Sequence, residues 1–154
     1  MRPFLDTNVL VYATTADDLS RQAAALRLVA TLGLTNITIS TQVLAEAYNV
    51  LTRKKRWVVG DALQAVRGFK AMRIVVLGAD AVLDALELAA RHRLSTWDAM
   101  VIHAAQEAGC DTLFSEDLQN GRRFGSLEVV NPFLHTAHEA SAGAGAYPAD
   151  PPPR

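Results

Sequence analysis

Acidic side chains stand directly after short apolar runs in this sequence, and Asp6 is the clearest example. It follows the run at 2–5 (Arg-Pro-Phe-Leu), which has the length of a short buried strand. Because ligands of open α/β sheets bind at the carboxyl ends of the strands, an Asp at this point is placed for chemistry. Asp-Thr-Asn at 6–8 is also ordinary turn sequence, so Asp6 alone does not separate a functional carboxylate from a turn residue.

Three more acids occupy comparable positions, each directly after an expected strand or in the first turns of an expected helix: Glu46, Asp98 and Asp117. In a parallel sheet, strand ends and the helix starts that follow them share one edge. We therefore expect these acids to gather around Asp6. Each also has an ordinary interpretation, since Ser95-x-x-Asp98 resembles a capping box, Asp117 suits an Asx turn and Glu46 suits a solvated helix.

A gathering of carboxylates predicts a metal site. Three or four acids within a few ångströms repel one another and require a compensating cation. Oxygen ligands suit Mg²⁺ or Mn²⁺, whereas zinc prefers the cysteine and histidine clusters that this chain, with Cys110 as its single cysteine, lacks. A divalent ion held this way polarises a phosphate and activates water, so phosphodiester hydrolysis is the predicted chemistry.

The elements that must position these acids follow from the pattern of apolar runs. Strands are expected at 2–5, 37–40, 73–77, 112–114 and 127–130, and helices at 19–32, 41–53, 61–70, 80–91 and 95–109. The alternation predicts an α/β fold of three layers, α/β/α, with a central parallel sheet of four to five strands.

Several details of these elements can be checked. Asp17 or Asp18 is expected to cap the first of these helices, Thr41 the second and Asp61 the third. The first helix carries one apolar face formed by Leu19, Ala23, Leu26 and Ala30, and the run at 9–12 continues the apolar register after Asp6.

The bulk composition limits the class of protein. The length of 154 residues suits one domain, expected at 1–135, and the Ala-, Gly- and Pro-rich stretch 136–154 is expected to be disordered. A net charge of −1 supplies no overall cationic field, so binding of nucleic acid must use local basic patches. Apolar runs too short to span a membrane, and no recognisable signal peptide, favour a cytoplasmic protein.

Together, the motifs resemble those of the PIN-domain nucleases, and among them the VapC-like toxin ribonucleases of type II toxin–antitoxin systems. Three segments carry the resemblance: 4–8 (Phe-Leu-Asp-Thr-Asn), 94–102 (Leu-Ser-Thr-Trp-Asp-Ala-Met-Val-Ile) and 110–121, which contains Ser-Glu-Asp. The helix start at 41–46 fits the second acid of the family. The resemblance extends from about Arg2 to Phe133.

The resemblance implies a Mg²⁺- or Mn²⁺-dependent endoribonuclease that forms a homodimer and is silenced by a small cognate antitoxin. It implies that the metal-binding acids are Asp6, Glu46, Asp98 and Asp117. It assigns supporting polar roles to Asn8 and Ser115, and it allows Glu116 as an additional acid. Trp97 stands where aromatic residues are common in this subfamily and is expected to pack.

Basic residues supply candidates for RNA contact, namely Arg53, Arg56, Arg122 and Arg123, whereas Lys54 and Lys55 are interpreted as charge at a helix end. Two other functions remain open. An aspartyl-phosphate hydrolase or receiver-like protein would use Asp6 as nucleophile. Such a site needs a lysine near the phosphate, and no lysine is expected at a strand end with the acids. The hydrolase also needs a second Asp where Asn8 stands. The other alternative is a non-catalytic PIN-like binding module.

Overall fold

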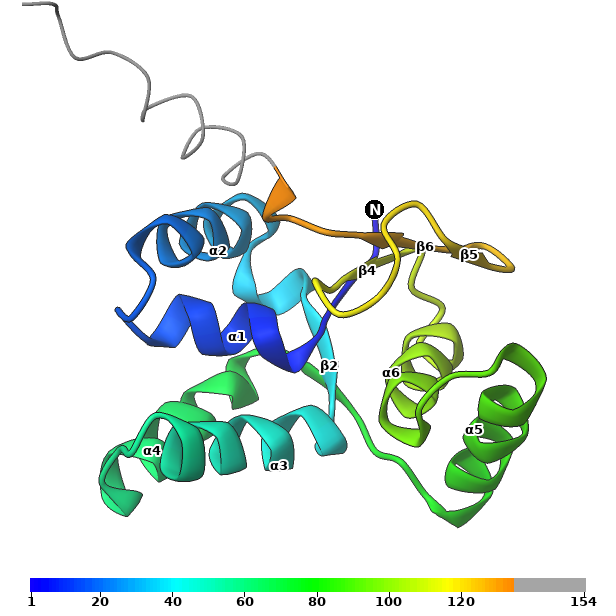
Figure 1. Ribbon diagram of the computed structural model, residues 1–154, viewed down its shortest axis with the longest axis horizontal. Coiled ribbons are helices and arrows are strands. Elements are labelled where there is room, and N and C mark those ends of the chain that lie inside the picture. The colour runs from blue at the N-terminus through cyan, green and yellow to red at the C-terminus, as the bar shows by residue number, and fades with distance from the viewer. Residues whose placement is uncertain (135–154) are drawn as a thin grey trace, which may run out of the picture.

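A six-stranded sheet forms the centre of the computed structural model, which describes residues 1–134 (Figure 1). The strand order is β3-β2-β1-β4-β6-β5. Five strands run parallel, as predicted: β1 (Pro3–Leu5), β2 (Thr38–Ser40), β3 (Arg73–Val75), β4 (Thr112–Phe114) and β6 (Leu127–Val130). The α/β fold and its parallel centre are therefore confirmed.

A sixth strand was not predicted. β5 (Arg123–Phe124) pairs antiparallel with β6 and extends the sheet at its edge. Gly125, with φ of 63°, lies in the tight turn that joins the two strands. Two residues are too few to show the alternation by which a strand is recognised, so this strand could not be read from the sequence.

Helices cover both faces of the sheet. α1 and α2 lie on one side of it, and α5 and α6 lie on the other (Figure 1). The bounds of the helices are α1 (Thr7–Thr14), α2 (Leu19–Leu32), α3 (Thr41–Asn49), α4 (Val59–Gly68), α5 (Ala79–His92) and α6 (Thr96–Glu107). The last turn of α3 widens into a π-helical segment, η2 (Val50–Lys54), and short 3₁₀ turns occur at Leu34–Asn36 and Phe69–Ala71.

Helix α1 begins within one residue of the end of β1, and the sequence did not reveal it. Asp6 is its N-cap, with Oδ1 accepting a hydrogen bond from the Thr7 amide at 2.7 Å. Val9, Leu10 and Val11 are all buried, so the helix lacks the polar face that marks an amphipathic helix. The abrupt turn from strand to helix is what places three successive polar side chains, at 6–8, at the edge of the sheet.

The bounds predicted for α2 agree with the structure, but the predicted face does not. Asp18, not Asp17, caps the helix through the Arg21 amide at 3.0 Å. Leu19 and Leu26, on the face expected to pack, are 70% and 49% exposed. Ala24 and Ala25 are buried instead, and the partly buried hydrophobic residues that join them at the core are Leu28, Val29 and Leu32.

Two other predicted caps differ from the structure. Ser40, rather than Thr41, is the N-cap of α3, and its Oγ accepts from the Val43 amide at 3.3 Å. Helix α4 begins at Val59, ahead of Asp61, which lies in its first turn where a negative charge favours the helix dipole. Ser95 caps α6, as its motif predicted.

The core lies on both faces of the central strands, where Phe4, Ile39 and Leu113 are fully buried. Cys110 is buried beside them. Within residues 1–134, no helix has the length and apolar character needed to cross a membrane. The stretch predicted to be disordered, 136–154, lies outside the described residues.

Candidate active site

The strand order creates a switch point between β1 and β4. Strands β2 and β3 are added on one side of β1, and the later strands β4, β6 and β5 are added on the other side. Leu5 pairs with Phe114, so the residues that follow the two strands emerge side by side. The Asp6 amide donates to the Phe114 carbonyl at 3.0 Å and extends this pairing by one residue. Ligands of open parallel sheets bind at such a point.

A cavity of about 540 Å³ opens at this edge, and the four acids expected to gather there all line it. They come from four separate parts of the chain: Asp6 follows β1, Glu46 lies in α3, Asp98 in the first turn of α6, and Asp117 in the loop after β4. Asn8 and Glu116 line the same cavity. Ser115 is fully buried beneath Asp6 and is described with it below.

Asp6 is the most buried of the four acids, at 7% exposed. Its Oδ2 accepts a hydrogen bond from Ser115 Oγ at 2.7 Å, in addition to the bond from the Thr7 amide to Oδ1. Burial raises the pKa of Asp6 to about 6, and the negative charges of Asp117 and Glu46 act in the same direction, against the two hydrogen bonds. A positive charge in this cavity would therefore be stabilised.

Asn8 and Ser115 bridge Asp6 and Asp117. Asn8 Nδ2 donates to Asp117 Oδ2 at 2.9 Å and reaches Asp6 Oδ2 at 3.5 Å. Ser115 Oγ donates to Asp6 while it accepts from the Asp117 amide at 3.2 Å. The two polar residues therefore hold the first and last acids in one arrangement. Asn8 Oδ1 is buried and has no hydrogen-bond partner among the described residues.

Glu46 is held by two residues that the sequence did not single out. Thr7 Oγ1 donates to Glu46 Oε2 and Gln42 Nε2 donates to Oε1, each at 2.8 Å. Gln42 Nε2 also donates to the carbonyl of Trp97 at 3.2 Å, which ties α3 to the start of α6. The signals for both were local: Thr7 adjoins Asp6, and Gln42 precedes Glu46 by four residues, the spacing at which side chains on a helix meet.

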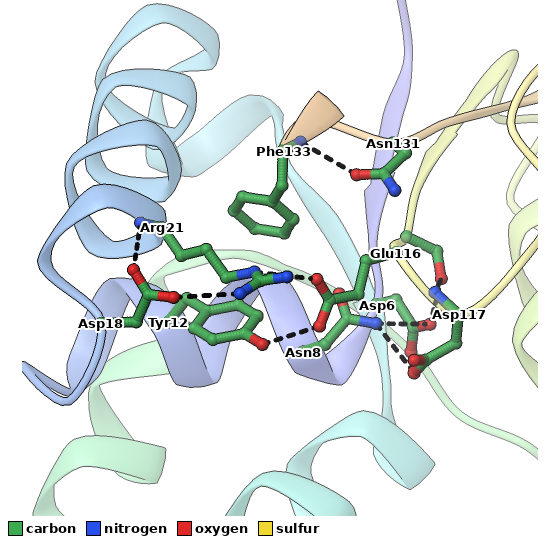
Figure 2. A network of polar contacts seen from close by, with 10 residues as sticks. Asp6, Asn8, Tyr12, Asp18, Arg21, Glu116, Asp117, Asn131 and Phe133 are labelled. Carbon is green, nitrogen blue, oxygen red and sulfur yellow. Dashed lines mark hydrogen bonds and ion pairs between the residues drawn. The ribbon is translucent and has the colours of Figure 1, made fainter. Parts of the chain in front are cut away.

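Glu116 is directed away from Asp117, although the two are adjacent in sequence (Figure 2). Its Oε1 accepts from the Tyr12 hydroxyl at 2.7 Å and its Oε2 from Arg21 Nε at 3.1 Å. Arg21 is itself paired with Asp18 at 2.9 Å. Burial and the Glu116 carboxylate raise the pKa of Tyr12 to about 12, so its hydroxyl remains a donor at neutral pH. Glu116 thus anchors the loop after β4 to α1 and α2.

The basic side chains that line the cavity are Lys54, the last residue of the π-helical segment η2, and Lys55, which caps it. Lys55 pairs with Asp17 at 2.6 Å. The four arginines proposed for RNA contact are not among the lining residues: Arg53, Arg56, Arg122 and Arg123. The guanidinium carbon of Arg122 lies 4.7 Å from the centroid of the Phe124 ring, and Arg123 pairs with Glu128.

Trp97 does not pack in the interior as expected. Its side chain is 61% exposed and lines the cavity beside Asp98. The buried residues of helix α6 begin at Ala99, and Trp97 lies two residues earlier, in the first turn, outside this buried set. The aromatic residue therefore belongs to the cavity wall rather than to the core.

The carboxylate oxygens in the cavity are the type of ligand that a hard divalent cation prefers, but they do not converge on one point. Among residues 1–134, no three His, Cys, Asp or Glu side chains are arranged to hold one ion together. The carboxylate oxygens of Asp6, Glu46 and Asp117 instead accept hydrogen bonds from neutral donors. The raised pKa of Asp6 and the unpaired Asn8 Oδ1 are both features that an added cation and its water would relieve.

A parallel sheet with carboxylates at its switch point defines a small α/β domain built around an acidic cavity. The chain belongs to the PIN domain family, whose model matches residues 4–123. The recognition based on the three sequence segments is thereby confirmed. No curated protein matches the sequence.

Solved structures with the same fold include toxins and toxin–antitoxin complexes. VapC20 of Mycobacterium tuberculosis, described as a Sarcin-Ricin loop cleaving toxin, is 27% identical, with 75% of this chain and 91% of that chain covered and a TM-score of 0.64. A toxin–antitoxin complex from Klebsiella pneumoniae is 17% identical, with 84% and 97% covered and a TM-score of 0.65. The DNA-bound VapBC of Salmonella typhimurium is also 17% identical, with 84% and 96% covered and a TM-score of 0.60.

Proposed function

We propose that this protein is a metal-dependent endoribonuclease and the toxin of a toxin–antitoxin pair. The observation that carries the proposal is that Asp6, Glu46, Asp98 and Asp117 all line one cavity at the switch point of a PIN domain. The 27% identity to a toxin that cleaves the sarcin–ricin loop supports RNA as the substrate.

Mg²⁺ or Mn²⁺ would be held by these four acids. When bound, the ion would polarise the scissile phosphate and lower the pKa of a water molecule that attacks it. Asn8 and Ser115 keep Asp6 and Asp117 in register, while Thr7 and Gln42 do the same for Glu46. Lys54 is placed to bind a phosphate of the RNA backbone, because it is exposed and lines the cavity.

A small cognate antitoxin is the expected protein partner, and a basic side chain from it would be attracted to the acidic cavity. The solved complexes with the same fold support such a partner. We also propose a homodimer in the cytoplasm, and the exposed Leu19 and Leu26 offer apolar area for association. Light scattering of the purified chain measures its oligomeric state.

An aspartyl-phosphate mechanism is the second candidate, because Lys54 and Lys55 do lie in the cavity, contrary to the expectation that no lysine accompanies the acids. It is the weaker candidate. Asp6, the nucleophile it requires, is 7% exposed and accepts hydrogen bonds on both oxygens. Asn8 also takes the position of the second Asp that the hydrolases need.

The deciding experiment incubates the purified protein with labelled single-stranded and structured RNA in Mg²⁺, in Mn²⁺ and in EDTA. We expect internal cleavage that depends on the metal and is lost in Asp6→Asn. An aryl-phosphate substrate included in parallel tests the alternative. Cleavage that persists in EDTA, or turnover of the aryl phosphate without cleavage of any RNA, would refute the proposed nuclease. Absence of both activities would favour the non-catalytic module.

A further inference from the structure

Trp97 presents an exposed aromatic surface that has no role in the metal site proposed for the four acids. The other described Phe, Trp and Tyr side chains are buried or half-buried, whereas Trp97 is 61% exposed. It immediately precedes Asp98 in the chain. A large indole beside the acids is therefore available to whatever enters the cavity.

A second cavity, of about 600 Å³, is also lined by this residue. Its apolar wall is formed by Leu77, Val82 and Met100. The two cavities share Glu46, Asn49 and Trp97 among their lining residues, so they meet at the indole. A ligand that reaches from the acids past Trp97 would pass from a charged compartment into an apolar one.

The backbone that carries Trp97 is fixed with respect to the acids. Its carbonyl accepts from Gln42 Nε2, and the same amide group donates to Glu46. Ser95 Oγ accepts from the Asp98 amide at 3.1 Å and holds the first turn of α6 in place. These contacts connect the backbone of Trp97 to two of the acids, so the point from which the indole extends is fixed relative to the reacting group.

We propose that Trp97 stacks on an unpaired nucleobase of the RNA next to the scissile phosphate, and that the second cavity receives this base. The inference rests on the proposed nuclease function. A nucleotide joins a charged phosphate to a flat, largely apolar base, which matches the order of the acidic cavity, Trp97 and the apolar cavity. Proteins that bind single-stranded RNA commonly stack its bases on aromatic side chains.

An RNA base suits this location better than a protein side chain does, because the two cavities adjoin and a base is covalently linked to the phosphate that would lie at the acids. Glu46 and Asn49 line both cavities together with Trp97, so a ligand that extends from one cavity to the other passes the site of reaction. Stacking tolerates every base, so the contact supplies affinity and position, and the polar groups of Thr41 and Asn49 at the second cavity add preference among bases.

The first test measures cleavage kinetics. For Trp97→Ala we expect KM for single-stranded RNA to rise roughly 5- to 150-fold, the range that corresponds to the loss of one stacked base, with kcat changed less than about threefold. Trp97→Phe should recover most of the affinity because a phenyl ring still stacks. Leu83→Ala is the matched control: Leu83 is 59% exposed and lines neither cavity.

The second test observes the indole itself and does not depend on cleavage. The chain has two tryptophans, so Trp57→Phe leaves Trp97 as the single tryptophan, which is observed by exciting the indole selectively over the tyrosines. With Asp6→Asn added to prevent turnover, titration with RNA in Mg²⁺ should quench the fluorescence of Trp97, and an RNA with an abasic residue beside the cleavage position should not. If Trp57→Phe fails to fold, the difference between the wild-type and Trp97→Phe spectra reports the same signal.

The outcomes separate this inference from the proposed function. Metal-dependent cleavage with an unchanged KM in Trp97→Ala and no quenching would overturn the stacking role and leave the nuclease intact. An altered oligomeric state in Trp97→Ala, with unchanged RNA binding, would assign Trp97 to a protein interface and would likewise overturn it. Failure of the wild-type protein to cleave any RNA would instead contradict the proposed function.

Discussion

Replacing Asp6 by Asn should make the metal-free protein more stable at neutral pH. Asp6 ionises with a pKa of about 6 in the folded chain, against 3.8 for an ordinary Asp, so ionisation at pH 7 opposes folding. At about 1.4 kcal/mol per pH unit, the difference corresponds to about 3 kcal/mol for a side chain this deeply buried. An Asn keeps an acceptor for the Thr7 amide and obliges Ser115 to reorient, which leaves a net gain of about 1–3 kcal/mol.

The sign of the pH dependence follows from the raised pKa. The neutral acid causes no loss of stability below about pH 4, and the loss grows as the pH rises and is complete above the folded pKa of about 6. The stability of Asp6→Asn should therefore exceed that of the wild type by more at pH 7.5 than at pH 5. Urea unfolding in EDTA at the two pH values measures this difference.

Asp111→Asn is the matched control with the opposite sign. The Arg2 amide donates to both Asp111 oxygens at 3.0 Å, and this hydrogen bonding lowers the pKa of Asp111. Its contribution is present at neutral pH and is lost as the pH falls through the lowered pKa, so the variant should be less stable than the wild type at pH 7.5. If Asp6→Asn is destabilised at pH 7.5, or gains equally at both pH values, then Asp6 is a structural residue and the reasoning about the cavity is refuted.

Three further results are expected. Mg²⁺ at millimolar concentration should raise the Tm of the wild type more than that of Asp6→Asn, and equal shifts in a thermal scan would count against binding at the acids. Gln42→Leu should raise the Mg²⁺ concentration for half-maximal cleavage about 10- to 100-fold, because Glu46 Oε1 loses its hydrogen-bond donor. An unchanged Mg²⁺ dependence of cleavage would show that Gln42 does not position Glu46. Lys54→Ala should raise KM for RNA and reduce the slope of log binding constant against log salt concentration by about one. Arg122→Ala should change neither quantity, because the Arg122 guanidinium lies against the Phe124 ring outside the cavity. The reverse result would show that the RNA backbone contacts Arg122 rather than Lys54.

The parts of the fold that were predicted correctly depend on local sequence. Five apolar runs became the five parallel strands, and α2 spans Leu19–Leu32 because Asp18 and Gly33 mark its ends. The positions of Asp6 and Asp117 could also be predicted, because a residue that closely follows a parallel strand lies at the edge of the sheet. Glu46 and Asp98 lie in helices, and α6 follows α5 rather than a strand, so the place of these two acids depends on how the helices pack.

The errors concern choices that depend on distant parts of the chain. Helix α2 has two apolar faces, and periodicity alone does not decide between them. The small side chains of Ala24 and Ala25 allow close packing, so that face is buried and Leu19 remains outside. Similarly, Tyr12 donates a hydrogen bond to Glu116, which lies 104 residues later in the sequence, and no local sequence pattern predicts such a contact.

The hydrogen bonds around the acids explain how the domain carries carboxylates that repel one another. Thr7, Gln42, Asn8 and Ser115 each direct a neutral donor at an acid. The carboxylates of Asp6, Glu46 and Asp117 are therefore partly satisfied without a full positive charge. These donors offset only part of the cost of a buried negative charge, because burial first, and the charges of Asp117 and Glu46 after it, still raise the pKa of Asp6 to about 6. A bound cation would remove this remaining unfavourable electrostatic energy. The same energy therefore lowers the stability of the metal-free protein and increases its affinity for the metal. A variant that removes this unfavourable energy should gain stability and lose metal affinity together.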